Sequence, residues 1–360
     1  MNSQLLRQGW IKWLFLVFLL LPLFAQMAQV GQSSETQERR TFQSWPALPG
    51  SVAEAAGYTH QVESYLNDHF GMKKFLAFVP LIRYRFEENI QVGSTIIGRD
   101  RVLFYAGDDS VAKHQGKFCL TAAQLDTLRD RISTLKAATD AVGARLVLTI
   151  APDKQSIYPD YLPEWMRFAG GCSLYDQALQ QMQASGVPAV DLRPVLLAAK
   201  REGALPYLRN DTHWNETGAL YAYRALRPAL GLGNSLPDMH PELRQRAGGD
   251  LAVGLNMPEA GEWTTIYHVP LEAALVTAPL PGAAVRGTYT PTLTTRPGAG
   301  VKTLVIGDSF SQAGLTRFAT LDASTVYWSH VQFHDEALLV RQLHPQLVIF
   351  EEVERNAGLW

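Results

Sequence analysis

The sequence predicts an α/β protein built on a doubly wound parallel sheet. About five short apolar segments alternate with helix-forming segments, as in a parallel sheet that helices cover on both faces. Hydrophobic residues make up 47% of the 360 residues and charged residues 18%, which excludes a disordered or coiled-coil chain. Pro152 and Gly307 directly follow two of the apolar segments, where buried strands are expected to end.

The N-terminal 30 residues are expected to be an export segment. Arg7 and Lys12 precede or flank an apolar run from Trp13 to Phe24, the order of a charged region and a hydrophobic region in export signals. A cut after Ala28 would place Gln26, which is not small, three residues before the cleavage site. A retained signal anchor is therefore favoured over a cleaved signal peptide, and the rest of the chain is expected outside the cytoplasm.

The polar, proline-containing stretch 31–50 is expected to be a linker, and the folded domain to run over 51–360. The pattern from Val52 to Phe86 predicts helix, and that from Ile90 to Tyr105 a β-hairpin. Residues 230–300, rich in Pro and Gly, are interpreted as a large insertion rather than a second core.

The α/β units follow in order from residue 121. Thr121 is expected to cap a helix over Ala122–Ala141 that leads into a strand at Arg145–Ala151. The other predicted strands are Val187–Asp191, Val301–Ile306, Ser324–Trp328 and Gln346–Phe350. The other predicted helices are Ser173–Ser185, Thr217–Arg227 and one that begins near Gln312.

The turn from Gly307 to Ser311, of sequence Gly-Asp-Ser-Phe-Ser, is the first candidate site because it follows a strand, and sites in open α/β sheets lie beyond the strands' carboxyl ends. Gly307 permits a tight turn. Ser309 would stand at the start of a helix, where backbone amides and the positive dipole end could hold an oxyanion. Taken alone, an ordinary helix cap is the more frequent explanation of such a turn.

The segment Asn210–Asn215 is the second candidate site. A serine hydroxyl becomes a good nucleophile when an imidazole takes its proton and a carboxylate orients that imidazole. Asp211 and His213 lie two residues apart, so in a turning segment the carboxylate could reach Nδ1 while Nε2 faces Ser309. The alternative is a helix-capping cluster in which Asn215 is the cap and His213 is merely packed.

Other residues are weaker candidates. Lys154 could meet an acidic sugar or be a solvated loop lysine, and Trp214, Tyr207 and Trp328 could stack on pyranose rings or belong to the core. Arg317 is expected at the surface. His330 and His334 could compete for the base role, but no acid neighbours His330, and Asp335 is merely adjacent to His334.

Cys119 and Cys172 are too few for a thiol-built metal site, and we expect them to form a disulfide in an oxidising compartment. The alternative is a pair of buried free thiols. No dinucleotide, Walker or His-Glu-x-x-His pattern occurs, so neither a metal nor a nucleotide cofactor is expected. The formal net charge of −2 gives no basic surplus, so no nucleic-acid partner is expected.

Several motifs agree in order and spacing with one family. They are Gly98–Tyr105, Ala151–Lys154 with Tyr158-Pro159, Asp211–Trp214, Gly248–Leu251, Gly307–Ser311 and Val353–Asn356. Together they resemble the periplasmic polysaccharide O-acetyltransferases of the alginate type, the AlgJ/AlgX-like branch of the SGNH-hydrolase fold. The resemblance covers about residues 60 to 356.

The resemblance implies Ser309 as nucleophile, His213 as general base and then acid, and Asp211 as the group that orients His213. Gly307 and Asp308 would support the nucleophile turn. Ordinary SGNH esterases place the Asp and His after the Ser, whereas here both precede it, which favours the acetyltransferase branch. The sequence contains no assignable counterpart of the glycine and asparagine blocks that complete the oxyanion hole in the wider superfamily.

The function implied is O-acetylation of an alginate-like or cellulose-like bacterial exopolysaccharide through an acetyl-serine intermediate. The resemblance also implies a membrane-bound O-acyltransferase partner that supplies acetyl groups, and a periplasmic location, with the N-terminal segment anchored in the inner membrane. Two alternatives remain: a carbohydrate acetyl esterase with the same triad, and a non-catalytic glycan-binding subunit of an exopolysaccharide secretion complex.

Overall fold

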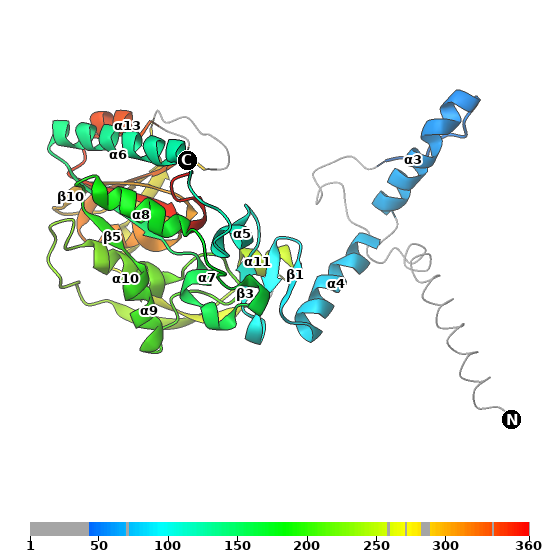
Figure 1. Cartoon of the computed structure of the whole chain (residues 1–360), viewed down its shortest axis with the longest axis horizontal. Helices are drawn as coiled ribbons and strands as arrows, with labels where there is room; N and C mark the ends of the chain where they lie inside the picture. The colour runs from blue at the N-terminus through cyan, green and yellow to red at the C-terminus, as the bar shows by residue number, and fades with distance from the viewer. Residues whose placement is uncertain are drawn as a thin grey trace. The chain divides into compact units, whose positions relative to one another are not determined.

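The computed structural model describes residues 43–69, 72–257, 260–270, 272–281, 289–332 and 335–359. The chain divides into two compact units, Met1–Phe86 and Glu87–Trp360, which are considered separately (Figure 1). The predicted export segment over 1–30 and most of the predicted linker lie outside the described residues. Within the described part of the chain, we find no helix with the length and apolar character that crossing a bilayer requires.

The described part of the first unit is helical, as the sequence predicts. It forms two helices, α3 (Val52–His69) and α4 (Met72–Phe86). Ahead of α3, the ring of Trp45 meets that of Tyr65 edge-on, with centroids 4.9 Å apart.

The second unit begins with a small antiparallel sheet of β1 (Ile90–Val92), β2 (Thr95–Ile97) and β3 (Leu103–Tyr105). The predicted hairpin is therefore confirmed, and β3 extends it by a third strand. The amide of Leu103 donates a hydrogen bond of 2.7 Å to the carbonyl of Arg209. The small sheet thus supports the segment that carries Asp211.

The second unit is built on a seven-stranded sheet in the order β5-β4-β12-β10-β11-β9-β8. The five predicted strands are present and parallel: β4 (Arg145–Ala151), β5 (Ala189–Asp191), β10 (Val301–Gly307), β11 (Ala323–His330) and β12 (Leu347–Val353). The prediction of a purely parallel sheet is wrong at one edge, where β9 (Thr292–Thr295) and β8 (Val276–Pro279) pair antiparallel. Part of the predicted insertion over 230–300 therefore belongs to the central sheet.

Helices cover both faces of this sheet, which makes the fold doubly wound (Figure 1). One face carries α6 (Ala122–Val142), α8 (Leu174–Ala184) and α13 (Glu336–Leu343). The other carries α9 (Arg193–Arg201), α10 (Glu216–Leu226) and α12 (Thr316–Ala319). Successive residues of a strand point to opposite faces, so Val147 joins one core and Leu148 the other.

Sequence signals set the ends of three of these helices. Thr121 and Gln124 form a capping box at the start of α6, and Ser173 caps α8. Asn215 caps α10 by accepting a hydrogen bond of 3.0 Å from the amide of Gly218. The predicted boundaries are confirmed within a residue or two.

The remaining elements lie in the connections. They are the short helices α5 (Ser110–His114), α7 (Lys154–Ile157) and α11 (Asp250–Gly254), and the hairpin of β6 (His240–Arg246) and β7 (Glu262–His268). Single 3-10 turns cover Arg99–Arg101, Pro159–Tyr161, Glu164–Met166, Glu272–Ala274 and Glu354–Asn356. The predicted disulfide between Cys119 and Cys172 is present, and it joins the segments that precede α6 and α8.

Candidate active site

The structure brings the two candidate motifs into one hydrogen-bonded line. His213 Nε2 lies 2.9 Å from Ser309 Oγ, and His213 Nδ1 lies 2.9 Å from Asp211 Oδ1. Ser309 follows β10, whereas Asp211 and His213 precede α10, so elements far apart in the sequence build the line. This is the geometry in which an imidazole can take a proton from a serine hydroxyl while a carboxylate sets its tautomer.

Local contacts hold the histidine in place. Asp211 Oδ1 accepts a second hydrogen bond of 2.9 Å, from the backbone amide of His213. The carboxylate therefore hydrogen-bonds to both the ring and the backbone of the same residue. The next residue, Trp214, donates from its indole N–H to the carbonyl of Phe310 at 2.9 Å. The ring of Phe310 also packs against that of His213, with centroids 5.0 Å apart. The histidine motif and the nucleophile turn are therefore joined by packing and by a buried hydrogen bond.

The carboxylate of Asp211 stays ionised over the working pH range of most enzymes. Burial alone would raise its pKa, but the hydrogen bonds and charge of His213 outweigh this and lower the pKa of Asp211 to about 2. An ionised partner stabilises the imidazolium that forms when His213 takes a proton.

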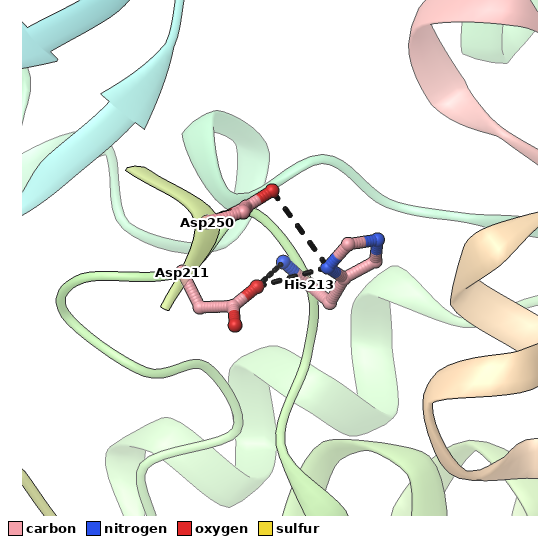
Figure 2. Close-up of side chains that lie close together, drawn as sticks. All are labelled: Asp211, His213 and Asp250. Atoms are coloured by element: carbon pink, nitrogen blue, oxygen red, sulfur yellow. Dashed lines mark hydrogen bonds and ion pairs between the residues drawn. The ribbon is translucent and has the colours of Figure 1, made fainter. Parts of the chain in front are cut away.

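A second carboxylate, that of Asp250, lies beside the same ring nitrogen (Figure 2). Asp250 Oδ2 is 4.0 Å from His213 Nδ1, and Oδ1 accepts a hydrogen bond of 2.7 Å from the amide of Thr212. Gly249 allows the turn that carries Asp250 to pack closely against Asp211, because a Cβ at position 249 would lie 2.4 Å from Asp211 Cβ. The turn Gly248–Leu251 is one of the motifs that carry the resemblance, but no role was predicted for Asp250; the local signal for it was the Gly-Gly-Asp turn itself.

Ligand atoms of Asp211, His213 and Asp250 lie within 4.8 Å of one another, close enough to share a metal ion. A metal on Nδ1 would displace the hydrogen bond by which Asp211 orients the ring. Nε2 is placed to accept a hydrogen bond from the hydroxyl of Ser309, as a base does, so the cluster favours acid–base chemistry over metal binding.

Gly307 and Asp308 shape the nucleophile turn. A Cβ on Gly307 would lie 2.5 Å from Ser311 Oγ and 2.6 Å from Glu351 Oε2, so only glycine fits there. Asp308 is buried, and its carboxylate accepts hydrogen bonds from the amides of Phe310 at 2.8 Å and Val353 at 2.7 Å. Asp308 therefore ties the turn to the end of β12.

The turn leads into a π-helical segment, Ser311–Leu315, followed by α12, close to where the sequence predicts a helix. Ser309 stands at the N-terminal end of this helical stretch, where amides have no intrahelical partner. Because the Phe310 amide is already taken by Asp308, the amide of Ser309 itself is the backbone donor that the turn offers near the hydroxyl.

Lys154 is placed differently from either sequence interpretation. It is 2% exposed, and its ammonium donates to the carbonyls of Leu103 at 2.5 Å, Leu208 at 2.9 Å and Arg209 at 3.3 Å. Burial lowers the pKa of Lys154 to about 7, although nearby carboxylates such as Asp211 oppose the shift. Lys154 thus supports the loop before Asp211 rather than facing solvent.

The three candidate stacking aromatics are buried. Trp214 and Trp328 are each 1% exposed, and Tyr207 is 3% exposed. Their polar atoms are also occupied: Tyr207 donates to the carbonyl of Pro152 at 2.5 Å, and Trp328 donates to Ser311 Oγ at 2.8 Å. These rings form core around the site, so their faces are not platforms for a sugar.

Arg317, which was expected at the surface, keeps 24% of its side chain exposed but is not a free surface residue. It is half-buried and pairs with Glu216 at 2.7 Å and with Glu272 at 2.6 Å, which links α12 to α10 and to the inserted segment. His330 is buried and stacks on Tyr289, with ring centroids 4.2 Å apart. His334 lies outside the described residues.

Comparison with known proteins identifies the family of the second unit. The family model described as the SGNH hydrolase-like domain of acetyltransferase AlgX matches residues 95–321. A probable alginate O-acetylase AlgJ of Pseudomonas syringae pv. tomato is 26% identical over 193 residues, which are 53% of this chain and 47% of the relative. The AlgJ of Pseudomonas putida is 30% identical over 188 residues, 51% of this chain and 45% of the relative. The chain therefore matches about half the length of these curated relatives.

Solved structures support the fold. The O-acetyltransferase domain of Pseudomonas putida AlgJ superposes with a TM-score of 0.50 at 21% identity, covering 74% of this chain and 93% of that domain. A DHHW family protein from Eubacterium siraeum superposes with a TM-score of 0.52 at 15% identity, covering 75% of this chain and 93% of that protein.

Proposed function

Because the chain belongs to the family of SGNH hydrolase-like domains of acetyltransferase AlgX, we propose that it is a serine-dependent O-acetyltransferase acting on a bacterial exopolysaccharide. The observation that carries the proposal is the line of 2.9 Å contacts from Asp211 through His213 to Ser309. The hydroxyl, the base and the orienting carboxylate have the relative positions that acyl transfer requires.

In the first half-reaction, His213 Nε2 takes the proton of Ser309 as Oγ attacks the acetyl carbonyl of the donor. The carbonyl oxygen becomes an oxyanion, which the Ser309 amide can stabilise. When the tetrahedral intermediate collapses, the bond from the carbonyl carbon to the leaving oxygen breaks, and His213 returns its proton to that oxygen. Ser309 is left as an acetyl ester.

In the second half-reaction, His213 takes the proton of a sugar hydroxyl, whose oxygen attacks the acetyl group. The bond to Ser309 Oγ then breaks, and His213 returns the proton to the serine. Asp211 remains ionised through both steps and stabilises the imidazolium, consistent with its low pKa.

We also propose the location, the acetyl supplier and the acceptor of the reaction. The export segment over 1–30 would hold the domain in the periplasm at the inner membrane, and a membrane-bound O-acyltransferase would pass acetyl groups outward to Ser309. The names of the curated relatives point to alginate as their polymer. For this chain, the acceptor is either alginate-like or cellulose-like.

The test is to detect the intermediate. The protein is mixed briefly with an activated acetyl ester, and intact-mass and peptide analysis should show about 42 Da added at Ser309. Adding oligosaccharide should discharge the acetyl group and yield O-acetylated sugar. Discharge at the same rate with and without sugar would instead identify an esterase. Turnover without any acetyl on Ser309 would contradict the covalent mechanism, and no turnover would favour a glycan-binding subunit.

A further inference from the structure

A pocket of about 580 Å³ opens near the nucleophile turn but does not contain the triad. Its floor includes Asp153, Glu354 and Arg355, which follow the carboxyl ends of β4 and β12, and its outer wall includes Arg167 and Phe168. We propose that this pocket binds the sugar units of the acceptor chain that adjoin the unit being acetylated. This inference rests on the proposed function, because it assigns the pocket to the same acceptor.

The sheet topology favours a ligand at this position. From β4 the chain moves outward to β5, and it later enters β10 on the other side, with β12 between β4 and β10. Ligands of open α/β sheets bind outside the strands' carboxyl ends, where the winding reverses. Ser309 follows β10 and Arg355 follows β12, so the nucleophile and the pocket lie on neighbouring strand ends.

The inner end of the pocket lies one layer of side chains from the reacting atoms. The guanidinium of Arg355 lies 5.5 Å from the ring centroid of Phe310 and pairs with Asp153 at 2.5 Å. Phe310 follows Ser309 directly and packs on the ring of His213. Phe310 is fully buried and Arg355 is 9% exposed, so this layer closes the direct path, and a chain with one unit at Ser309 would reach the pocket over the outside of the layer.

The pocket lining suits a polyhydroxylated ring. It combines cations and anions with hydroxyl and amide groups, and includes Lys113, Arg193, Asp160, Asp176, Ser156 and Gln155. Sugar hydroxyls both donate and accept, so such a lining can hydrogen-bond to them from either side. Phe168, 52% exposed, offers an apolar face for the C–H groups of a ring. A second pocket of about 410 Å³ has Arg244, Arg246 and Arg317 against the single acid Glu216. Arg244 already pairs with Glu242, and Arg317 with Glu216 and Glu272, so much of its positive charge is neutralised within the protein.

The outer wall of the pocket is fixed by covalent and hydrogen bonds within the protein. The disulfide between Cys119 and Cys172 closes the segment that carries Arg167 and Phe168. Next to it, the amide of Cys172 donates to the carbonyl of Gly116 at 3.0 Å. A rigid wall loses little conformational freedom on binding, which favours affinity for a flexible polymer.

The test measures binding without chemistry. In the full chain carrying Ser309→Ala, titration calorimetry is done with a mannuronic acid tetrasaccharide and with cellotetraose. Adding Arg167→Ala or Phe168→Ala should raise the Kd of the bound tetrasaccharide about tenfold, because each removes a contact of ordinary strength. The matched controls, Arg341→Ala and Leu338→Ala, change exposed residues of α13 and should leave the Kd unchanged.

The inference is overturned if neither tetrasaccharide binds, if the Arg167 and Phe168 variants bind as tightly as their parent, or if Arg246→Ala alone weakens binding. Acetylation of Ser309 in the unsubstituted protein tests the proposed function separately. An acetyl group on Ser309 together with pocket variants that bind normally would reject this inference alone. Binding that depends on the pocket, without any acetyl on Ser309, would support this inference and contradict the acetyltransferase.

Discussion

Replacing Asp250 by Asn removes the negative charge that lies beside His213 Nδ1 and leaves most of the local geometry in place. In the structure, Asp250 Oδ2 is 4.0 Å from that nitrogen, while Oδ1 accepts a hydrogen bond from the Thr212 amide. An asparagine oxygen can still accept from Thr212. Asp250→Asn therefore changes the charge, and Asp250→Ala removes both the charge and the hydrogen bond.

The size of the effect follows from the distance between the Asp250 carboxylate and the His213 imidazolium. Two unit charges 4 Å apart interact by about 1 kcal/mol in water and about 4 kcal/mol at the dielectric of a protein surface. The side chain of Asp250 is 47% exposed, so solvent screening places the value near the lower end. Losing about 1 kcal/mol of imidazolium stabilisation should lower kcat/KM about fivefold.

The assay is the kcat/KM for a small activated acetyl ester, measured from about pH 5 to 9. Asp126→Asn, a change at an exposed carboxylate of α6, is the matched control and should leave kcat/KM unchanged. An unchanged kcat/KM in Asp250→Asn would refute the charge effect of Asp250 on His213. A slow Asp250→Ala would then assign Asp250 to the Thr212 hydrogen bond alone.

Three further predictions concern the site and the fold. Ser309→Ala and His213→Ala should each lower ester turnover about 10³-fold or more, as in other serine triads, with an unchanged circular dichroism spectrum; near-normal turnover in either would remove that residue from the mechanism. Changing Cys119 and Cys172 to Ala opens a link between residues 53 apart and should lower the free energy of unfolding by about 4 kcal/mol in urea titrations, and an equal urea midpoint would contradict this. Burial and the nearby Asp153 carboxylate raise the pKa of Glu354 from 4.5 to about 7, so the folded state favours the protonated carboxyl. The stability that Glu354 contributes is therefore fully present below about pH 4.5, and it is lost as the pH rises through about 7. Glu354→Gln should therefore flatten the fall in stability over that range, by up to about 1.4 kcal/mol per pH unit, and an unchanged slope would show that another group titrates.

Local signals predicted the elements that the second unit uses most. The central strands β4, β10 and β12 are short apolar runs buried on both faces, and such runs are visible without knowledge of their partners. Helix starts were equally predictable, because a capping residue such as Asn215 accepts a hydrogen bond from an amide only three residues away. The strands β8 and β9 were missed because neither is an apolar run with a buried face. All four residues of β8 are exposed, and β9, with three threonines among its four residues, is at most half-buried.

The sequence by itself determined which side chains are candidates for the proposed chemistry. A serine after a strand, and an aspartate two residues before a histidine, are choices of residue type and local spacing, and a resemblance in motif order gave each a role. Only the tertiary structure decided which of the remaining polar residues take part. Lys154, predicted as a loop residue, is buried under the Asp211 loop, and Asp250 lies 4.0 Å from His213 although 37 residues separate them in the sequence. Burial and charge proximity depend on which segments pack together, and that packing brings together strand ends and loops that no local pattern connects.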